Sequence, residues 1–101
     1  SDRVEALREE LLKLGYVLKI EGQDAISWYG ERVPLTQTPP VINPHGDHRL
    51  AMAFAPAAVR FPGLIITDAA VVEKSYPTYW KHLGNAGFTI APIGTINAIV
   101  R

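Results

Sequence analysis

The segment Gly46-Asp47-His48-Arg49 joins three ionisable side chains directly to an apolar, alanine-rich run, Leu50-Ala51-Met52-Ala53-Phe54. A run of this kind predicts a buried helix. The start of a helix exposes free backbone N–H groups and carries a partial positive charge, so it attracts anions. His48 and Arg49 would add hydrogen-bond donors and charge to a site for a carboxylate or a phosphate. The structural alternative is that Asp47 only caps the helix and Arg49 only pairs with an acid.

Two further cations are expected at comparable positions. Arg3 falls in the first turn of a predicted helix, and Lys74 comes one residue before the predicted cap of another. The helix dipole disfavours a cation there by up to about 1 kcal/mol, so a bound anion would explain the placement. Arginine can form two parallel hydrogen bonds to a planar anion, and lysine offers a compact charge. Arg3, Arg49 and Lys74 are therefore candidate anion-binding residues, expected to meet between the second helix and Lys74. The alternative is solvated cations, or partners for Glu73 or Asp68.

His48 is a candidate catalytic residue with two roles left open. It can donate a hydrogen bond or pass a proton to a substrate, or it can be fixed by hydrogen bonding and orient Arg49. His45, Asp47 and His48 also suggest a metal site. Because ligands on a helix are spaced three or four residues apart along one face, these three residues cannot easily converge on one ion. We therefore expect no metal.

A first helix is predicted from residue 2 to residue 14. Asp2 followed by Glu5 fits a capping box, and Gly15 fits the helix end. One apolar stripe recurs at helical spacing and consists of Val4, Leu7, Leu11 and Leu14. The charged residues between them are predicted to face solvent: Glu5, Arg8, Glu9, Glu10 and Lys13.

A hairpin is predicted next, with alternating strands at 16–21 and 25–29 around the turn Gly22-Gln23-Asp24. Residues 30–40 contain three prolines and predict a loop. Val41-Ile42 predicts a short strand that leads into the Asn43-Pro44-His45-Gly46 turn.

The second helix is predicted over residues 48–60. Apolar residues cover most of its circumference, which predicts that it lies inside the domain. Pro56 removes one backbone hydrogen bond and should kink the helix. Strands are predicted at 64–67 and 71–72.

A third helix is predicted after a Ser75 cap, with Pro77 in its first turn and its end near Gly87. Residues 88–90 predict a strand, and residues 91–101 have no pattern that places them. Because helices and strands interleave without a linker, the sequence predicts a single domain over residues 1–101 of the α/β or α+β class.

Composition excludes several classes of protein. Lys and Arg together number 10, as do Asp and Glu, so the net charge is zero and nucleic-acid binding is not expected. There is no cysteine, so neither a disulfide framework nor thiolate catalysis is expected. No apolar run approaches 18 residues, so no membrane span is expected. These observations together predict a cytoplasmic protein.

Three short motifs carry a resemblance. The stretch from Asp47 to Ala53 resembles the D-H-R-M-A-M motif of the 5-enolpyruvylshikimate-3-phosphate synthases, with Leu50 in place of methionine. Ser1-Asp2-Arg3 resembles the end of the family's K-E-T-D-R stretch, with serine in place of threonine. Lys74-Ser75-Tyr76-Pro77 resembles its K-[ST]-[FY]-P segment. The three motifs in this order match roughly the last quarter of such an enzyme.

The resemblance implies a fold of repeated βαβαββ units with sheets outside and helices inside, of which this chain has about one. It implies that Arg3 and Arg49 hold the carboxylate of phosphoenolpyruvate and that Lys74 lies near its phosphate. The implied reaction transfers the enolpyruvyl group to the 5-hydroxyl of shikimate 3-phosphate, releases phosphate and needs no metal or organic cofactor. The proton-transferring carboxylates and most shikimate 3-phosphate contacts are expected elsewhere in the enzyme. We therefore expect the isolated chain to be inactive and to self-associate through unpaired strand edges.

Two alternatives remain. The sister enzyme transfers enolpyruvyl to a UDP-sugar, but it has a different arginine motif and in most members a catalytic cysteine. A non-enzymatic module of the same fold would bind anions without catalysis.

Overall fold

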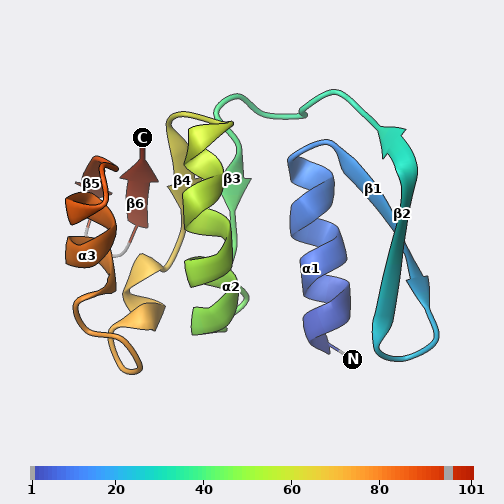
Figure 1. Cartoon of the computed structure of the whole chain (residues 1–101), viewed down its shortest axis with the longest axis horizontal. Helices are drawn as coiled ribbons and strands as arrows, with labels where there is room; N and C mark the ends of the chain where they lie inside the picture. The colour runs from blue at the N-terminus through green and yellow to red at the C-terminus, as the bar shows by residue number, and fades with distance from the viewer. Residues whose placement is uncertain (1, 95–96) are drawn as a thin grey trace.

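The computed structural model describes residues 2–94 and 97–101. In Figure 1, helix α1 lies between a β-hairpin on one side and, on the other, helix α2 with a second sheet. The elements in chain order are α1 (Asp2–Lys13), β1 (Tyr16–Glu21), β2 (Ala25–Arg32), β3 (Val41–Ile42), α2 (His48–Phe54), the 3₁₀ turn η1 (Ala55–Val59), β4 (Leu64–Ile66), the 3₁₀ turn η2 (Ala69–Val72), α3 (Tyr79–Asn85), β5 (Ile90–Ile93) and β6 (Asn97–Val100). Helices and strands are mixed, as predicted.

The first helix and the hairpin are confirmed. β1 pairs with β2 antiparallel, with Leu18 opposite Trp28 and Ile20 opposite Ile26, and β2 runs on to Arg32. The prediction that Glu10 faces solvent is wrong, because this residue is only 1% exposed. Ser1 and the side chain of Asp2 lie outside what the structure describes, so the predicted capping box stays a prediction.

The second sheet has the strand order β3-β4-β6-β5. β3 and β4 are parallel, and the other two pairs are antiparallel. The strand predicted at 41–42 is confirmed, and the strand predicted at 64–67 is found at 64–66. The strand predicted at 88–90 begins only at Ile90, and much of the stretch that the sequence could not place forms β5 and β6. The core lies between this sheet and the helices; its larger fully buried side chains include Ile42, Leu64, Ile66, Val72 and Val100.

Pro56 changes the second helix as the sequence predicts. The chain is α-helical to Phe54 and then tightens into η1. Proline has no N–H, so the carbonyl of Met52, four residues earlier, loses its helical donor. The hydroxyl of Tyr79 in α3 donates to that carbonyl instead, at 2.7 Å. The helix is not enclosed on all sides within this chain, since Ala53 is exposed and buried residues occupy one face.

Two predictions between β4 and α3 are wrong. Val71 and Val72 belong to η2 and not to a strand. Ser75 does not cap α3, because the backbone N–H groups of Ser75 and Tyr76 both donate to the carbonyl of Val72 and so continue the turn. The helix begins only after Thr78 and ends at Asn85. Two β-branched residues are too short a pattern to distinguish a strand from a buried turn.

None of the helices in residues 2–94 and 97–101 is long and apolar enough to cross a membrane.

Candidate functional site

Asp47 joins the first turns of α1 and α2. Nε of Arg3 donates to Asp47 Oδ2 at 2.8 Å. The other carboxylate oxygen, Oδ1, accepts from the backbone N–H of Arg49 at 2.9 Å and so caps α2. The predicted helix cap by Asp47 is therefore confirmed, although Asp47 does not only cap the helix. The same contacts also bring Arg3 and Arg49, two of the predicted site residues, to one place.

The environment of Asp47 keeps its carboxylate charged. Burial by itself would raise the pKa of Asp47. The hydrogen bonds from the Arg49 N–H and the Arg3 guanidinium, with the positive charges of both arginines, outweigh burial and leave the pKa below its ordinary value. Asp47 thus offsets one of the two arginine charges.

A hollow opens beside this ion pair. It measures about 490 Å³ and is lined by Arg3, Ala6, His45, Asp47 and Leu50. The side chain of Arg3 is 55% exposed, and Arg49 is exposed as well. Within residues 2–94 and 97–101, the guanidinium of Arg49 forms no hydrogen bond or ion pair. Both arginines are therefore accessible to an anion.

Lys74 is not joined to the arginines by any contact in the described part of the chain, and it is exposed. It lies in the turn after η2. In Figure 1 this turn and the starts of α1 and α2 lie at the same, lower end of the molecule. His48 is the first residue of α2 and is half-buried. The roles of Lys74 and His48 remain predictions.

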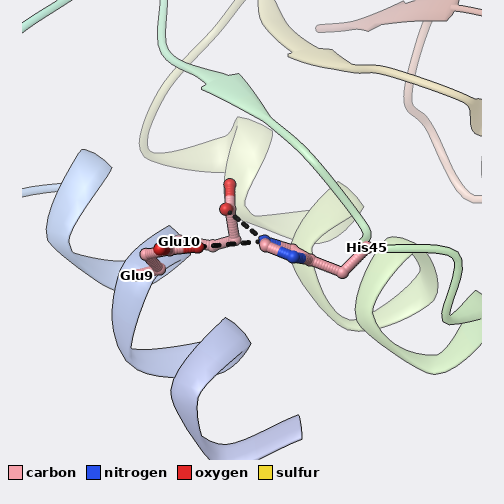
Figure 2. Close-up of side chains that lie close together, drawn as sticks. All are labelled: Glu9, Glu10 and His45. Atoms are coloured by element: carbon pink, nitrogen blue, oxygen red, sulfur yellow. Dashed lines mark hydrogen bonds and ion pairs between the residues drawn. The ribbon is translucent and has the colours of Figure 1, made fainter. Parts of the chain in front are cut away.

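A second set of contacts, which the sequence did not predict, lies further along α1 (Figure 2). Nε2 of His45 lies 2.7 Å from Glu10 Oε2 and 3.4 Å from Glu9 Oε2. Glu10 Oε1 accepts from the Asn43 N–H at 2.9 Å and from Lys13 Nζ at 2.7 Å. Because a carboxylate only accepts, Nε2 of His45 is the protonated ring nitrogen. The buried carboxylate is thus fully hydrogen-bonded.

The sequence carried a signal for this network. Ala6, Glu10 and Leu14 are four residues apart, so they lie on one side of the helix, and all three are buried. Ligand atoms of Glu9, Glu10 and His45 lie within 4.8 Å of one another, a spacing that a metal ion could use. However, His45, Lys13 and the Asn43 N–H already satisfy Glu10, so the arrangement is complete as a hydrogen-bonded network.

Comparison with known proteins assigns the chain to a family. A family model described as EPSP synthase (3-phosphoshikimate 1-carboxyvinyltransferase) matches residues 1–83. A Bacteroides fragilis protein named 3-phosphoshikimate 1-carboxyvinyltransferase is 53% identical over 90 residues, which cover 89% of this chain and 22% of that protein. A protein of the same name from Syntrophobacter fumaroxidans is 47% identical, over 80% of this chain and 18% of that protein. Another from Pseudomonas syringae pv. syringae is 36% identical, over 88% of this chain and 22% of that protein.

The chain spans about a fifth of the length of the curated relatives it matches. No solved structure matches it significantly. The family match covers most of the chain and includes all three motifs that the sequence singled out. The chain belongs to the EPSP synthase family.

Proposed function

We propose that this chain contributes the phosphoenolpyruvate site of an enzyme that transfers the enolpyruvyl group to the 5-hydroxyl of shikimate 3-phosphate. Arg3 and Arg49 bind the carboxylate of phosphoenolpyruvate, and Lys74 lies near its phosphate. The observation that carries the proposal is that Asp47 binds both the Arg3 side chain and the Arg49 backbone N–H at the starts of two helices, in a member of this family.

The chemistry of the two arginines supports this assignment. Arg3 contacts Asp47 through Nε, and its terminal nitrogens form no hydrogen bond within the described residues. Those nitrogens can therefore donate to a ligand in the hollow. A guanidinium forms two parallel hydrogen bonds with a carboxylate, so two arginines can fix both the position and the plane of the group.

In the proposed reaction, the 5-hydroxyl of shikimate 3-phosphate gives up its proton to a base and its oxygen bonds to C2 of phosphoenolpyruvate, while C3 gains a proton from an acid. The bond from C2 to the phosphate oxygen then breaks, phosphate leaves, and C3 gives up a proton. Holding the two reactants together can supply about 7–11 kcal/mol of the barrier. Proton transfer by positioned groups supplies roughly 10²- to 10⁴-fold. This chain provides anion binding, with His48 as a hydrogen-bond donor or proton carrier, and the carboxylates that move protons belong to the rest of the enzyme. By itself the chain is therefore inactive.

We also propose that the fold contains one βαβαββ unit of the family. The elements β3, α2, β4, α3, β5 and β6 follow one another in that order and supply one four-stranded sheet. The preceding elements α1, β1 and β2 have the order of the second half of such a unit. This order supports the proposal that the chain spans one and a half units of a larger domain.

The proposal is tested by kinetics on a chimera in which this chain replaces the matching segment of the Bacteroides fragilis relative. Arg49→Lys keeps the charge but not the bidentate geometry. It should raise KM for phosphoenolpyruvate roughly 10- to 100-fold, since a charge-assisted hydrogen bond contributes about 1.5–3 kcal/mol, and leave KM for shikimate 3-phosphate within about twofold. Arg8→Lys is the matched control, because Arg8 pairs with Glu5 on the surface of α1. Equal effects on both constants, or none, would contradict the assignment.

The same chimera separates the alternatives. A UDP-sugar enolpyruvyl transferase would accept a UDP-sugar in place of shikimate 3-phosphate. The names of the relatives favour the shikimate enzyme. A non-enzymatic module would give a chimera that binds phosphoenolpyruvate but releases no phosphate from it.

A further inference from the structure

Two side chains of helix α1 contact the segment that precedes α2, residues 43–47. Arg3 and Glu10 are seven positions apart, which is close to two helical turns, so they lie on the same side of α1. Arg3 contacts Asp47, and Glu10 contacts Asn43 and His45. We propose that the Glu10–His45 contact positions the phosphoenolpyruvate site, by fixing the loop that presents Asp47 to Arg3. This inference rests on the proposed function.

The contacts of Glu10 determine the path of the loop. One carboxylate oxygen accepts from the backbone of Asn43 and the other binds the ring of His45, so a single buried side chain holds both ends of this three-residue stretch. The stretch is also closed internally, because the His45 N–H donates to Asn43 Oδ1 at 2.9 Å. The Asp47 N–H then donates to the carbonyl of Pro44 at 2.9 Å. Asp47 therefore follows a loop with little freedom.

The backbone of His45 indicates that side-chain contacts impose this path. Its φ is +53°, in the left-handed region that few residues other than glycine adopt, with histidine and asparagine among the more frequent. Such conformations persist where the surrounding structure determines them, and they concentrate at functional sites. Two contacts hold the His45 side chain in place, and the one with Glu10, at 2.7 Å, is shorter than the one with Glu9, at 3.4 Å.

Glu10 is not needed simply to fill space. Its buried neighbours on the same side of the helix, Ala6 and Leu14, are apolar. An apolar residue there would avoid the cost of desolvating a carboxylate, and buried ion pairs are often replaced by apolar residues without loss of stability. What an apolar residue cannot do is hold His45 and Asn43 in one geometry. A site that binds a small anion needs that geometry, since a displacement of about 1 Å can cost as much as about 100-fold.

Two substitutions at His45 test the contact. The amide nitrogen of His45→Gln lies the same number of bonds from the backbone as Nε2 of histidine, so this variant keeps the donor to Glu10. His45→Asn carries the same amide one carbon nearer the backbone, tolerates a positive φ, and cannot reach Glu10. In both variants Glu10 Oε1 keeps Asn43 and Lys13 as partners, whereas Oε2 keeps a donor only in His45→Gln, so thermal unfolding must be compared between the two variants. Glu5→Gln on the exposed surface of the same helix is the control.

The experiment is an NMR titration of the 101-residue chain with phosphoenolpyruvate, together with hydrogen exchange at the Arg49 amide and thermal unfolding. We expect His45→Asn to weaken binding about tenfold or more and to speed exchange of the Arg49 amide. His45→Gln and Glu5→Gln should both behave like the unmodified chain. Equal binding by the Asn and Gln variants of His45 would overturn the positioning role, as would a loss of affinity matched by a general loss of folding.

Failure of the proposed function gives a different result. If the unmodified chain shows no specific shifts at Arg3 and Arg49 with phosphoenolpyruvate, the proposed anion site in this chain is wrong. The positioning inference is then decided by the Arg49 amide. Faster exchange in the Asn variant alone supports the loop contact, and unchanged exchange overturns it.

Discussion

The two ends of helix α2 are held by different kinds of contact. At its start, charged groups connect it to α1 through Asp47 and Arg3, while His45 in the preceding loop contacts Glu10. At its end, a neutral hydroxyl from Tyr79 in α3 satisfies the carbonyl that Pro56 leaves without a donor. Buried apolar residues pack around this second end, among them Phe54 and Ala58.

This difference shows that the contacts that fix the geometry of α2 are not the same as those that stabilise it. A buried carboxylate is a poor stabiliser in net terms, because desolvation offsets most of the attraction between the charges. Its contacts are nevertheless directional, so they fix geometry. A neutral hydrogen bond with apolar packing stabilises a helix end without placing charge near it. The charged contacts occur at the end where the candidate arginines lie, which is where geometry matters for binding.

The largest effect is expected from Glu10→Ala. Glu10→Ala leaves a cavity at a buried position and removes the acceptor of the Asn43 N–H and of the His45 ring, so the free energy of unfolding should fall by about 3 kcal/mol. Urea unfolding followed by circular dichroism measures this change. Glu5→Ala, in an exposed pair with Arg8, should change the free energy of unfolding by less than about 1 kcal/mol. Similar losses for the two variants would mean that burial of Glu10 has no energetic consequence.

A smaller effect is expected from Asp47→Ala. The loss of a helix N-cap costs about 0.5–2 kcal/mol, and the contact with Arg3 is lost as well. Asp47→Asn keeps a capping oxygen and should recover most of the stability. The comparison by urea unfolding separates capping from charge. If Asn is as destabilising as Ala, the ion pair with Arg3 and not the cap is the larger contribution.

A still smaller effect is expected at the other end of α2. Tyr79→Phe removes the hydroxyl that donates to the Met52 carbonyl and should cost about 1 kcal/mol. Burial raises the pKa of Tyr79, so its hydroxyl stays protonated and able to donate near neutral pH. Tyr76→Phe is the matched control, since the Tyr76 hydroxyl contacts His82 at an exposed position. Differential scanning calorimetry compares the two, and a cost for Tyr76→Phe as large as that for Tyr79→Phe would contradict the role given to Pro56.

The smallest effect on the free energy of unfolding is expected from protonation of Asp47 at acidic pH. The pKa of Asp47 is lowered in the folded chain, so its contribution to stability is complete above the ordinary aspartate pKa of about 3.9. That contribution disappears as the pH falls further, through the lowered folded-state pKa. Unfolding measured between about pH 5 and pH 2 should therefore depend less steeply on pH for Asp47→Asn than for the unmodified chain. Identical slopes would show that Asp47 is not held as the structure indicates.

Local signals predicted much of the fold. The stripe of Leu7, Leu11 and Leu14 placed α1, the Gly22 turn placed the hairpin, and Pro56 marked where α2 changes. Predictions failed where the deciding contact is distant in sequence. Val71 and Val72 have strand-forming side chains, yet η2 packs them as a turn against α2. Tertiary packing, and not strand propensity, therefore determines that these two residues form a turn.

The candidate site was predicted in part for the same reason. Arg3 and Arg49 stood out because cations are unusual at helix starts. Their link through Asp47 could not be read from sequence, because the two helices are separated by the whole hairpin. Glu10 was missed because charged residues on a helix are usually exposed, and its partners Asn43 and His45 lie more than thirty positions away.

The proline in the second helix also constrains how this sequence can vary over evolution. Any residue other than proline at position 56 would supply its own N–H to the Met52 carbonyl and would free the hydroxyl of Tyr79 from that task. Positions 56 and 79 should therefore change together among homologues. Sequences that keep proline should keep tyrosine, and phenylalanine should become acceptable at position 79 wherever the proline has been lost.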